Sequence, residues 1–156
     1  MPSTVCRNAF RRALLAPLTI WMLVMSGASI AADPPLVVAH EIVLAWNAID
    51  ADAIADLFTE DGTYQSMMDK PTKGREVIRE KFTALLSGAT YLKLHLRNIA
   101  VQGNVVFLER VDEFVYKGKE ASVPVVAVLE IEDGKVAEWR EYFDRAELME
   151  AMGMGH

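Results

Sequence analysis

The sequence has few of the residues on which cysteine and metal chemistry depend. Its one cysteine, Cys6, lies near the N-terminus, and its three histidines, His40, His95 and His156, do not share the spacing of a metal site. It also has no glycine-rich phosphate loop and no nucleophile elbow around a serine. We therefore predict no disulfide framework, no metal and no organic cofactor.

The N-terminal segment has the pattern of a secretory signal. Three arginines precede an apolar run over residues 13–25, and the small residues Ser29 and Ala31 follow it. The run is shorter than the roughly 20 residues that span a bilayer. We predict cleavage after Ala31, with the bond after Ala32 as the second choice, and export to the periplasm or the medium. The alternative is an uncleaved N-terminal anchor.

Residues 32–156 are expected to form a single acidic domain. These 125 residues carry 13 Lys and Arg against 22 Asp and Glu, a net charge of −9. Such a charge opposes binding to nucleic acid and to anionic membrane surfaces. We expect neither as a partner, and no stable membrane insertion once the signal is removed.

Hydrophobic periodicity predicts an α+β fold. Helical spacing occurs over residues 36–49, 50–58, 75–86 and 145–152. Strand alternation occurs over residues 91–101, 105–116, 121–132 and 135–143, with a shorter strand over 63–67. Residues 59–62 are typical of a turn, and Asp133-Gly134 is a strong hairpin signal. Because helices and strands are segregated along the chain, we expect three N-terminal helices to cover one face of a curved, mostly antiparallel sheet.

An unusual charged pair lies on one predicted strand. Arg110 and Asp112 are two residues apart, so a strand places both on one face, which Leu108 and Phe114 extend in both directions. Charges within an apolar stripe need partners, and apolar surroundings raise the pKa of a carboxyl group. The alternative is an ordinary ion pair on the surface of the sheet.

Two other sets of residues permit both a functional and a local interpretation. Asp144 follows the last strand, and Glu147 lies three residues on, which is the spacing of a helix capping box. Tyr64 and Ser66 share a face of the short strand, where they suit either a site or ordinary packing with local hydrogen bonds.

Three segments together resemble the limonene-1,2-epoxide hydrolase family, within the nuclear transport factor 2-like (SnoaL-like) superfamily. They are Tyr64-Gln65-Ser66-Met67, Glu109-Arg110-Val111-Asp112 and the segment from Gly134 to Asp144 with its Trp-Arg-Glu-Tyr-Phe-Asp ending. The resemblance covers about residues 37–152. It implies a cone-shaped sheet covered by the three helices, and a cofactor-independent active site.

The resemblance also implies roles for individual residues. Asp144 looks like the general base that activates water, Asp112 like the general acid that protonates the epoxide oxygen, and Arg110 like the bridge between them. Tyr64 looks like a water-positioning residue, and Ser66 stands where the family has an asparagine. A guanidinium shared by two carboxyl groups in a dry pocket can hold one ionised and one neutral, as this reaction requires.

The expected substrate is a small hydrophobic epoxide that is opened to a vicinal diol. Leu108, Phe114, Leu129 and Trp139 suit a pocket for it, although each of them also suits the plain core. Two alternatives stay open, since one fold can serve many functions: an isomerase or cyclase of the same superfamily, and a non-catalytic periplasmic ligand-binding module. Analogy with relatives adds a homodimer as an expected assembly.

Overall fold

The computed structural model describes residues 34–67 and 69–153, and this part of the chain has the predicted α+β fold. The predicted signal sequence and both of its cleavage sites lie outside the described residues, so export stays a prediction. Within the described ranges, no helix has the length and apolar character needed to cross a membrane.

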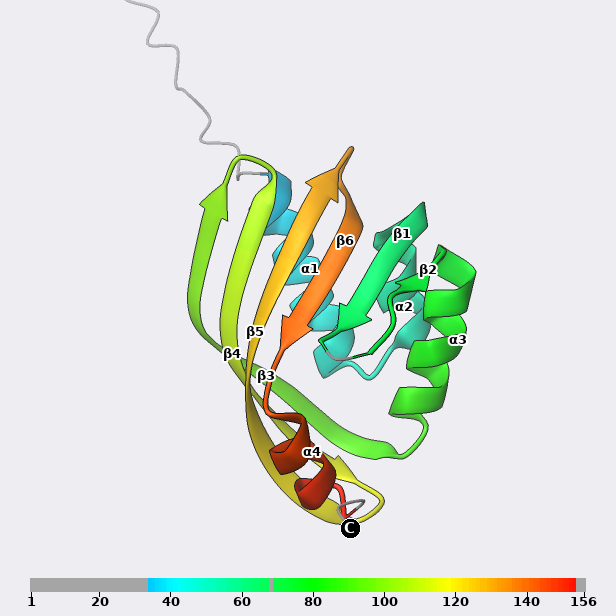
Figure 1. Ribbon diagram of the computed structural model, residues 1–156, viewed down its shortest axis with the longest axis vertical. Helices are drawn as coiled ribbons and strands as arrows, with labels where there is room; N and C mark the ends of the chain where they lie inside the picture. The colour runs from blue at the N-terminus through cyan, green and yellow to red at the C-terminus, as the bar shows by residue number, and fades with distance from the viewer. Residues whose placement is uncertain (1–33, 68, 154–156) are drawn as a thin grey trace, which may run out of the picture. The chain divides into compact units, whose positions relative to one another are not determined.

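Within residues 34–67 and 69–153, six strands form one curved sheet, and four helices accompany it (Figure 1). The helices are α1 (Pro34–Asn47), α2 (Ala51–Asp56), α3 (Arg75–Leu86) and α4 (Arg145–Ala151). The strands are β1 (Phe58–Ser66), β2 (Thr72–Lys73), β3 (Ala89–Gln102), β4 (Val105–Tyr116), β5 (Lys119–Glu132) and β6 (Lys135–Tyr142). The strand order is β2-β1-β6-β5-β4-β3, in which β1 and β6 are parallel and the other neighbours are antiparallel.

The predicted meander is confirmed, and its tight turns have the expected chemistry. Asp133 and Gly134 link β5 to β6 with φ angles of 49° and 74°, and Lys117 and Gly118 link β4 to β5 with φ angles of 49° and 79°. Two consecutive positive φ angles match the right-handed twist of the flanking strands. The turns therefore fix the register that brings β4, β5 and β6 side by side.

The predicted turn over residues 59–62 is wrong, because these residues belong to β1. Phe58 pairs with Val136 and Thr63 pairs with Glu138, so five steps along β1 correspond to two along β6. The polar Thr-Glu-Asp-Gly segment thus marks a bulge rather than a chain reversal. Gly62 allows the close approach, because a Cβ there would lie 3.1 Å from the carbonyl oxygen of Val136.

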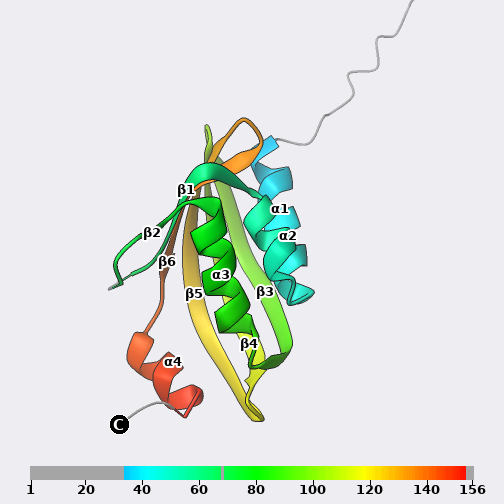
Figure 2. The ribbon, with the colours of Figure 1, turned by 90° about the vertical axis from the view of Figure 1, so that its right-hand side faces the viewer.

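The three N-terminal helices cover one face of the sheet, and α4 lies near its lower end (Figure 2). An aromatic cluster fills the space between the layers. Phe82 of α3 lies 4.8 Å from Tyr64 of β1 and 5.2 Å from Trp46 of α1, measured between ring centroids. Trp139 of β6 is fully buried and stacks on Phe58. The helices and the early strand β1 are thereby fixed against the meander.

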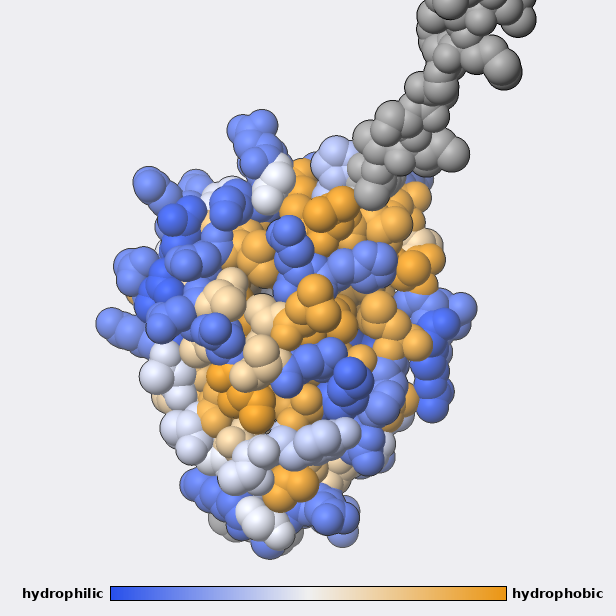
Figure 3. All heavy atoms as spheres, turned by 180° about the vertical axis from the view of Figure 1, so that it is seen from behind, coloured by the Kyte–Doolittle hydropathy of each residue, from blue (hydrophilic) through white to orange (hydrophobic). Residues whose placement is uncertain are grey.

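The helical face, seen in Figure 3, also carries exposed apolar side chains. Leu44 and Val37 of α1 are 67% and 39% exposed, although the opposite side of that helix is buried in the core. α1 is therefore apolar around most of its circumference, whereas α3 separates its apolar and polar sides clearly.

Adjacent leucines at the end of α3 provide a test of this packing. Leu86 is 7% exposed and Leu85 is 39% exposed. We expect Leu86→Ala to lower the free energy of unfolding by about 2 to 4 kcal/mol, because it leaves a cavity in the core. The matched control Leu85→Ala is expected to cost about 1 kcal/mol or less. Urea denaturation of both variants checks this, and equal losses would contradict the described helix orientation.

Candidate active site

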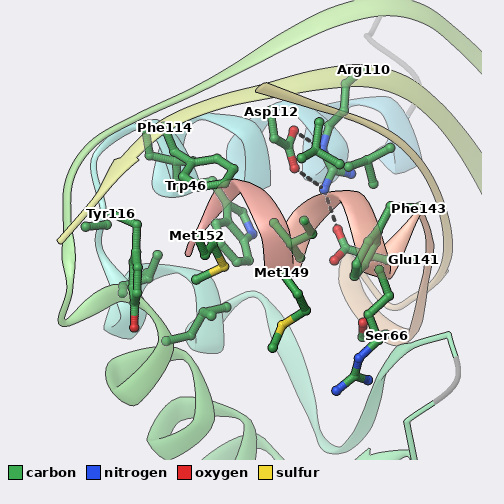
Figure 4. Close-up of a pocket in the computed structure, with 18 of the residues that line it drawn as sticks. Trp46, Ser66, Arg110, Asp112, Phe114, Tyr116, Glu141, Phe143, Met149 and Met152 are labelled. Atoms are coloured by element: carbon green, nitrogen blue, oxygen red, sulfur yellow. Dashed lines mark hydrogen bonds and ion pairs between the residues drawn. The ribbon is translucent and has the colours of Figure 1, made fainter. Parts of the chain in front are cut away.

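A cavity of about 270 Å³ opens between the concave side of the sheet, the end of α3 and α4. Its lining side chains come from α1, β1, α3, β3, β4, β5, β6 and α4 (Figure 4). Most of the wall is apolar, and the charged groups of Arg110, Asp112 and Glu141 lie together on one side of it. The site is thus a mainly apolar cavity in which these three charged side chains form one cluster.

β4 brings Arg110 and Asp112 together, as the alternation of that strand predicts. The Nε of Arg110 donates to Oδ1 of Asp112 at 2.7 Å, and its Nη2 donates to Oδ2 at 3.0 Å. The Arg110 side chain is 2% exposed and that of Asp112 is 18% exposed. The pair is therefore a buried, bidentate contact at a cavity, and the alternative of an ordinary surface ion pair is wrong.

β6 supplies the second carboxylate, Glu141. Trp139 and Glu141 are two residues apart and both are buried, so they occupy the inward face of the strand. The Nη2 of Arg110 also donates to Oε1 of Glu141, which places the guanidinium between two carboxyl groups. The hydroxyl of Tyr64, from the neighbouring β1, donates to Oε2 of Glu141 at 2.7 Å. Four side chains from three strands thus form one continuous polar network.

Burial sets the protonation behaviour of this network. It raises the pKa of Asp112 above its usual value, although the Arg110 guanidinium opposes the rise. Burial alone would lower the pKa of Arg110, but the Glu141 and Asp112 carboxylates outweigh it, and the pKa is raised. The pKa of Tyr64 is raised well above its usual value by burial and by the adjacent Glu141. Arg110 therefore keeps its charge, while Asp112 takes up a proton at a higher pH than a free aspartate does.

The structure does not place Asp144 beside Arg110. The prediction that Arg110 bridges Asp112 and Asp144 is therefore wrong. Asp144 follows the end of β6, is exposed and is absent from the cavity wall. Its Oδ1 accepts hydrogen bonds from the backbone N–H groups of Ala146 at 2.9 Å and Glu147 at 3.1 Å. Asp144 is thus the N-cap of α4, which is the local interpretation of the sequence.

The residue that sequence reasoning missed is Glu141. A signal for it was present, because Glu141 shares the strand face of Trp139, whereas Asp144 lies beyond the strand, where the period of two no longer applies. Tyr64 and Ser66 both line the cavity as expected, and both are buried. Tyr64, however, contacts the second carboxylate directly.

The predicted substrate pocket is right at one position in four. Phe114 lines the cavity. Leu108, Leu129 and Trp139 point into the packed core and are at most 1% exposed, so they belong to the core instead. The apolar wall comes mainly from other residues of the sheet and from α4: Leu92, Val123, Val125, Leu148, Met149 and Met152.

Charged groups at the mouth of the cavity connect separate elements. Arg145, at the start of α4, forms an ion pair with Asp69 of the loop that follows β1. Lys81 of α3 donates to Thr72 at 3.2 Å, and its Nζ lies 5.4 Å from the centroid of the Tyr64 ring. Across residues 34–67 and 69–153, no group of three or more His, Cys, Asp or Glu side chains is arranged to hold a metal ion.

Comparison with known families assigns this fold. Residues 38–139 match the family model of the SnoaL-like domain. The chain belongs to the SnoaL-like family. This confirms the predicted superfamily and fold, while membership in the narrower limonene-1,2-epoxide hydrolase family stays a prediction.

Solved structures with the same SnoaL-like architecture have diverse descriptions. A putative SnoaL-like polyketide cyclase from Jannaschia sp. CCS1 is 17% identical with a TM-score of 0.70, over 79% of this chain and 94% of that one. A limonene-epoxide-hydrolase-like (LEH-like) epoxide hydrolase from M. tuberculosis is 19% identical with a TM-score of 0.68, over 78% and 91% of the two chains. A hypothetical protein of ketosteroid isomerase-like fold from Catenulispora acidiphila DSM 44928, in complex with trimethylamine, is 20% identical with a TM-score of 0.68, over 75% and 92%. At these identities the similarity concerns the fold.

Removal of the central cation of this SnoaL-like site tests the charge balance. We expect Arg110→Met to lower the free energy of unfolding by about 3 to 5 kcal/mol near neutral pH, because the buried carboxyl groups of Asp112 and Glu141 lose the cation that lies between them. Arg140→Met is the matched control, since Arg140 also pairs with two carboxylates, Glu130 and Glu138, but its side chain is 23% exposed. We expect it to cost about 1 kcal/mol or less.

Thermal and urea denaturation measure both losses. The loss in Arg110→Met is expected to shrink at acidic pH, because protonated carboxyl groups no longer need the cation. A loss that is independent of pH would contradict the assigned charge balance.

Proposed function

We propose that the protein is an exported, cofactor-independent epoxide hydrolase that adds water to a small hydrophobic epoxide and releases a vicinal diol. The observation that carries the proposal is the buried guanidinium of Arg110 between Asp112 and Glu141 at the wall of an apolar cavity. The similarity to a protein described as an LEH-like epoxide hydrolase supports the same reaction. Glu141 takes the role of general base that the sequence suggested for Asp144.

The chemistry needs one carboxylate and one carboxylic acid at the same pH. Glu141 removes a proton from a water molecule, whose oxygen attacks a ring carbon of the epoxide. The carbon–oxygen bond of the ring breaks, and Asp112 gives its proton to the departing oxygen. Transfer of a proton from Glu141 back to Asp112, through solvent, restores the starting state. Groups acting in this way contribute about 10² to 10⁴-fold each to the rate.

The observed contacts suit a general base at Glu141 and a general acid at Asp112. The raised pKa of Asp112 favours the neutral form that a general acid needs. Glu141 accepts two hydrogen bonds that suit a general base, one from the Arg110 guanidinium and one from the Tyr64 hydroxyl. Each carboxylate oxygen has two acceptor positions, so the Tyr64 hydrogen bond leaves Oε2 able to accept from a water molecule.

Ser66 is placed to help to hold the water. It lies two residues beyond Tyr64 on the same buried face of β1, and it lines the cavity. Its hydroxyl can donate one hydrogen bond and accept others. In this proposal Tyr64 positions the base, Glu141, and Ser66 helps to position the water molecule that attacks the epoxide.

An isomerase or cyclase is the second candidate. A neighbour in fold is described as a putative polyketide cyclase, and a buried carboxylate such as Glu141 can also remove a proton beside a carbonyl group. Labelled water separates the two reactions. Hydrolysis places one oxygen from the solvent in the diol, whereas a proton shift or ring closure leaves the substrate oxygens in place.

The carboxylate assignment is tested by a set of isosteric variants. We expect Glu141→Gln and Asp112→Asn each to lower kcat/KM for limonene oxide or cyclohexene oxide by at least about 100-fold, because each removes one proton-transfer group. Asp144→Asn is the control, because asparagine also caps helices well. We expect its activity to stay within about twofold of the unmodified protein. Loss of activity in Asp144→Asn alone would restore the original assignment.

The pH dependence follows from the direction of the Asp112 shift. Its pKa is raised in the folded protein, and the acid form is the active one. We therefore expect kcat/KM to fall as the pH rises through this raised pKa, which lies above the usual value for aspartate. For the same reason, the stabilisation contributed by protonated Asp112 is present at low pH and is lost as the pH rises through the raised pKa. A rate that increases through this range would exclude Asp112 as the general acid.

A further inference from the structure

The cavity contains a buried hydrogen-bond donor that the proposed reaction does not use. Among the described residues, three buried side-chain nitrogens have no hydrogen-bond partner: Nε1 of Trp46, Nε1 of Trp139 and Nη1 of Arg110. Trp139 does not line the cavity, and Arg110 belongs to the catalytic group. Trp46 lines the cavity, is 8% exposed and comes from α1, which contributes no other group to the chemistry.

Packing holds the Trp46 ring in this orientation. Its centroid lies 5.2 Å from that of Phe82 and 6.0 Å from that of Trp139, with interplanar angles of 68° and 67°. Both contacts are edge-to-face arrangements, which fix the plane of the ring. Figure 4 shows the indole nitrogen on the edge of Trp46 that faces the cavity, across from Arg110 and Glu141. The N–H group therefore lies on the cavity side of the ring and not on the outer surface of the protein.

We propose that Trp46 is a specificity-determining residue that donates a hydrogen bond to an oxygen on the body of the substrate. This inference rests on the proposed function and narrows its substrate to an epoxide that carries a second oxygen, as a ketone, ether or hydroxyl group. A buried donor without an acceptor is costly, and a substrate oxygen removes that cost. A pure hydrocarbon epoxide would leave the donor unpaired.

The charge of the site decides which kind of oxygen fits. The indole N–H is neutral, and the adjacent group combines one guanidinium with two carboxyl groups. A carboxylate on the substrate would face Glu141 in a low-dielectric cavity, where like charges repel strongly. An uncharged oxygen accepts from Trp46 without this repulsion. The apolar wall then contacts the hydrocarbon part of the molecule.

Two substrates with one carbon skeleton test the inference. Limonene oxide and carvone oxide share that skeleton, and carvone oxide carries an additional ketone. We expect Trp46→Phe to lower kcat/KM for carvone oxide by about 2- to 12-fold more than for limonene oxide, which is the usual contribution of one hydrogen bond. The matched control is Trp139→Phe, which removes an unpaired indole outside the cavity. It is expected to change both rates in parallel.

The outcomes separate this inference from the proposed function. If the unmodified protein hydrolyses both epoxides and Trp46→Phe changes them equally, the hydrogen bond is absent and the epoxide hydrolase assignment stands. If neither epoxide is hydrolysed, that assignment fails, and calorimetric binding of carvone and limonene to both proteins tests the donor alone. A selective loss of carvone affinity in Trp46→Phe supports the donor, and an equal change in both affinities overturns it.

Discussion

The site depends on one buried cation. Arg110 is 3% exposed and contacts two carboxyl groups, so its removal from water is compensated only while both remain in reach. The three side chains come from β4 and β6, which are separated in the sheet by β5. The register of two hairpins therefore controls the distance between the carboxyl groups of Asp112 and Glu141. A slip of one residue in either hairpin would turn Arg110 or Glu141 to the outer face.

The strands supply the polar side chains of the site, and the helices hold these side chains in place. Tyr64 reaches Glu141 from β1, the parallel neighbour of β6, while Phe82 of α3 packs edge-on against the Tyr64 ring. The helical layer thus orients the hydrogen bond from Tyr64 to Glu141, although no helix supplies a member of the Arg110–Asp112–Glu141–Tyr64 network. Solved structures with this fold are described as an epoxide hydrolase and as a putative polyketide cyclase, which is consistent with function that depends on a few side chains rather than on the fold.

Much of the fold could be predicted from periodicity alone. The boundaries of α3 and β4 agree with their patterns, since strong hydrophobic repeats end at Gly74, Ser87 and the hairpin turns. The β1 bulge could not be predicted in this way. A polar segment beside Gly62 has the composition of a turn, and only its pairing with β6 makes it a strand. The site, too, depends on contacts that local periodicity does not predict. Alternation places Arg110 beside Asp112, but the contact between Arg110 and Glu141 joins residues 31 positions apart in the sequence. Motif similarity favoured the carboxylate after the strand, Asp144, over the one within it.

The way in which α4 is attached affects how molecules enter and leave the cavity. This helix buries no residue fully, although Leu148, Met149 and Met152 form part of the cavity wall. Its first turn is held by the Asp144 cap and by the pair between Arg145 and Asp69, whose side chains are 50% and 39% exposed. Dissolved salt screens an ion pair of this kind but hardly affects the buried cluster around Arg110. Ionic strength therefore acts on the attachment of α4 and hardly on the Arg110 network, so the access of molecules to the cavity and the charge balance inside it respond to different variables.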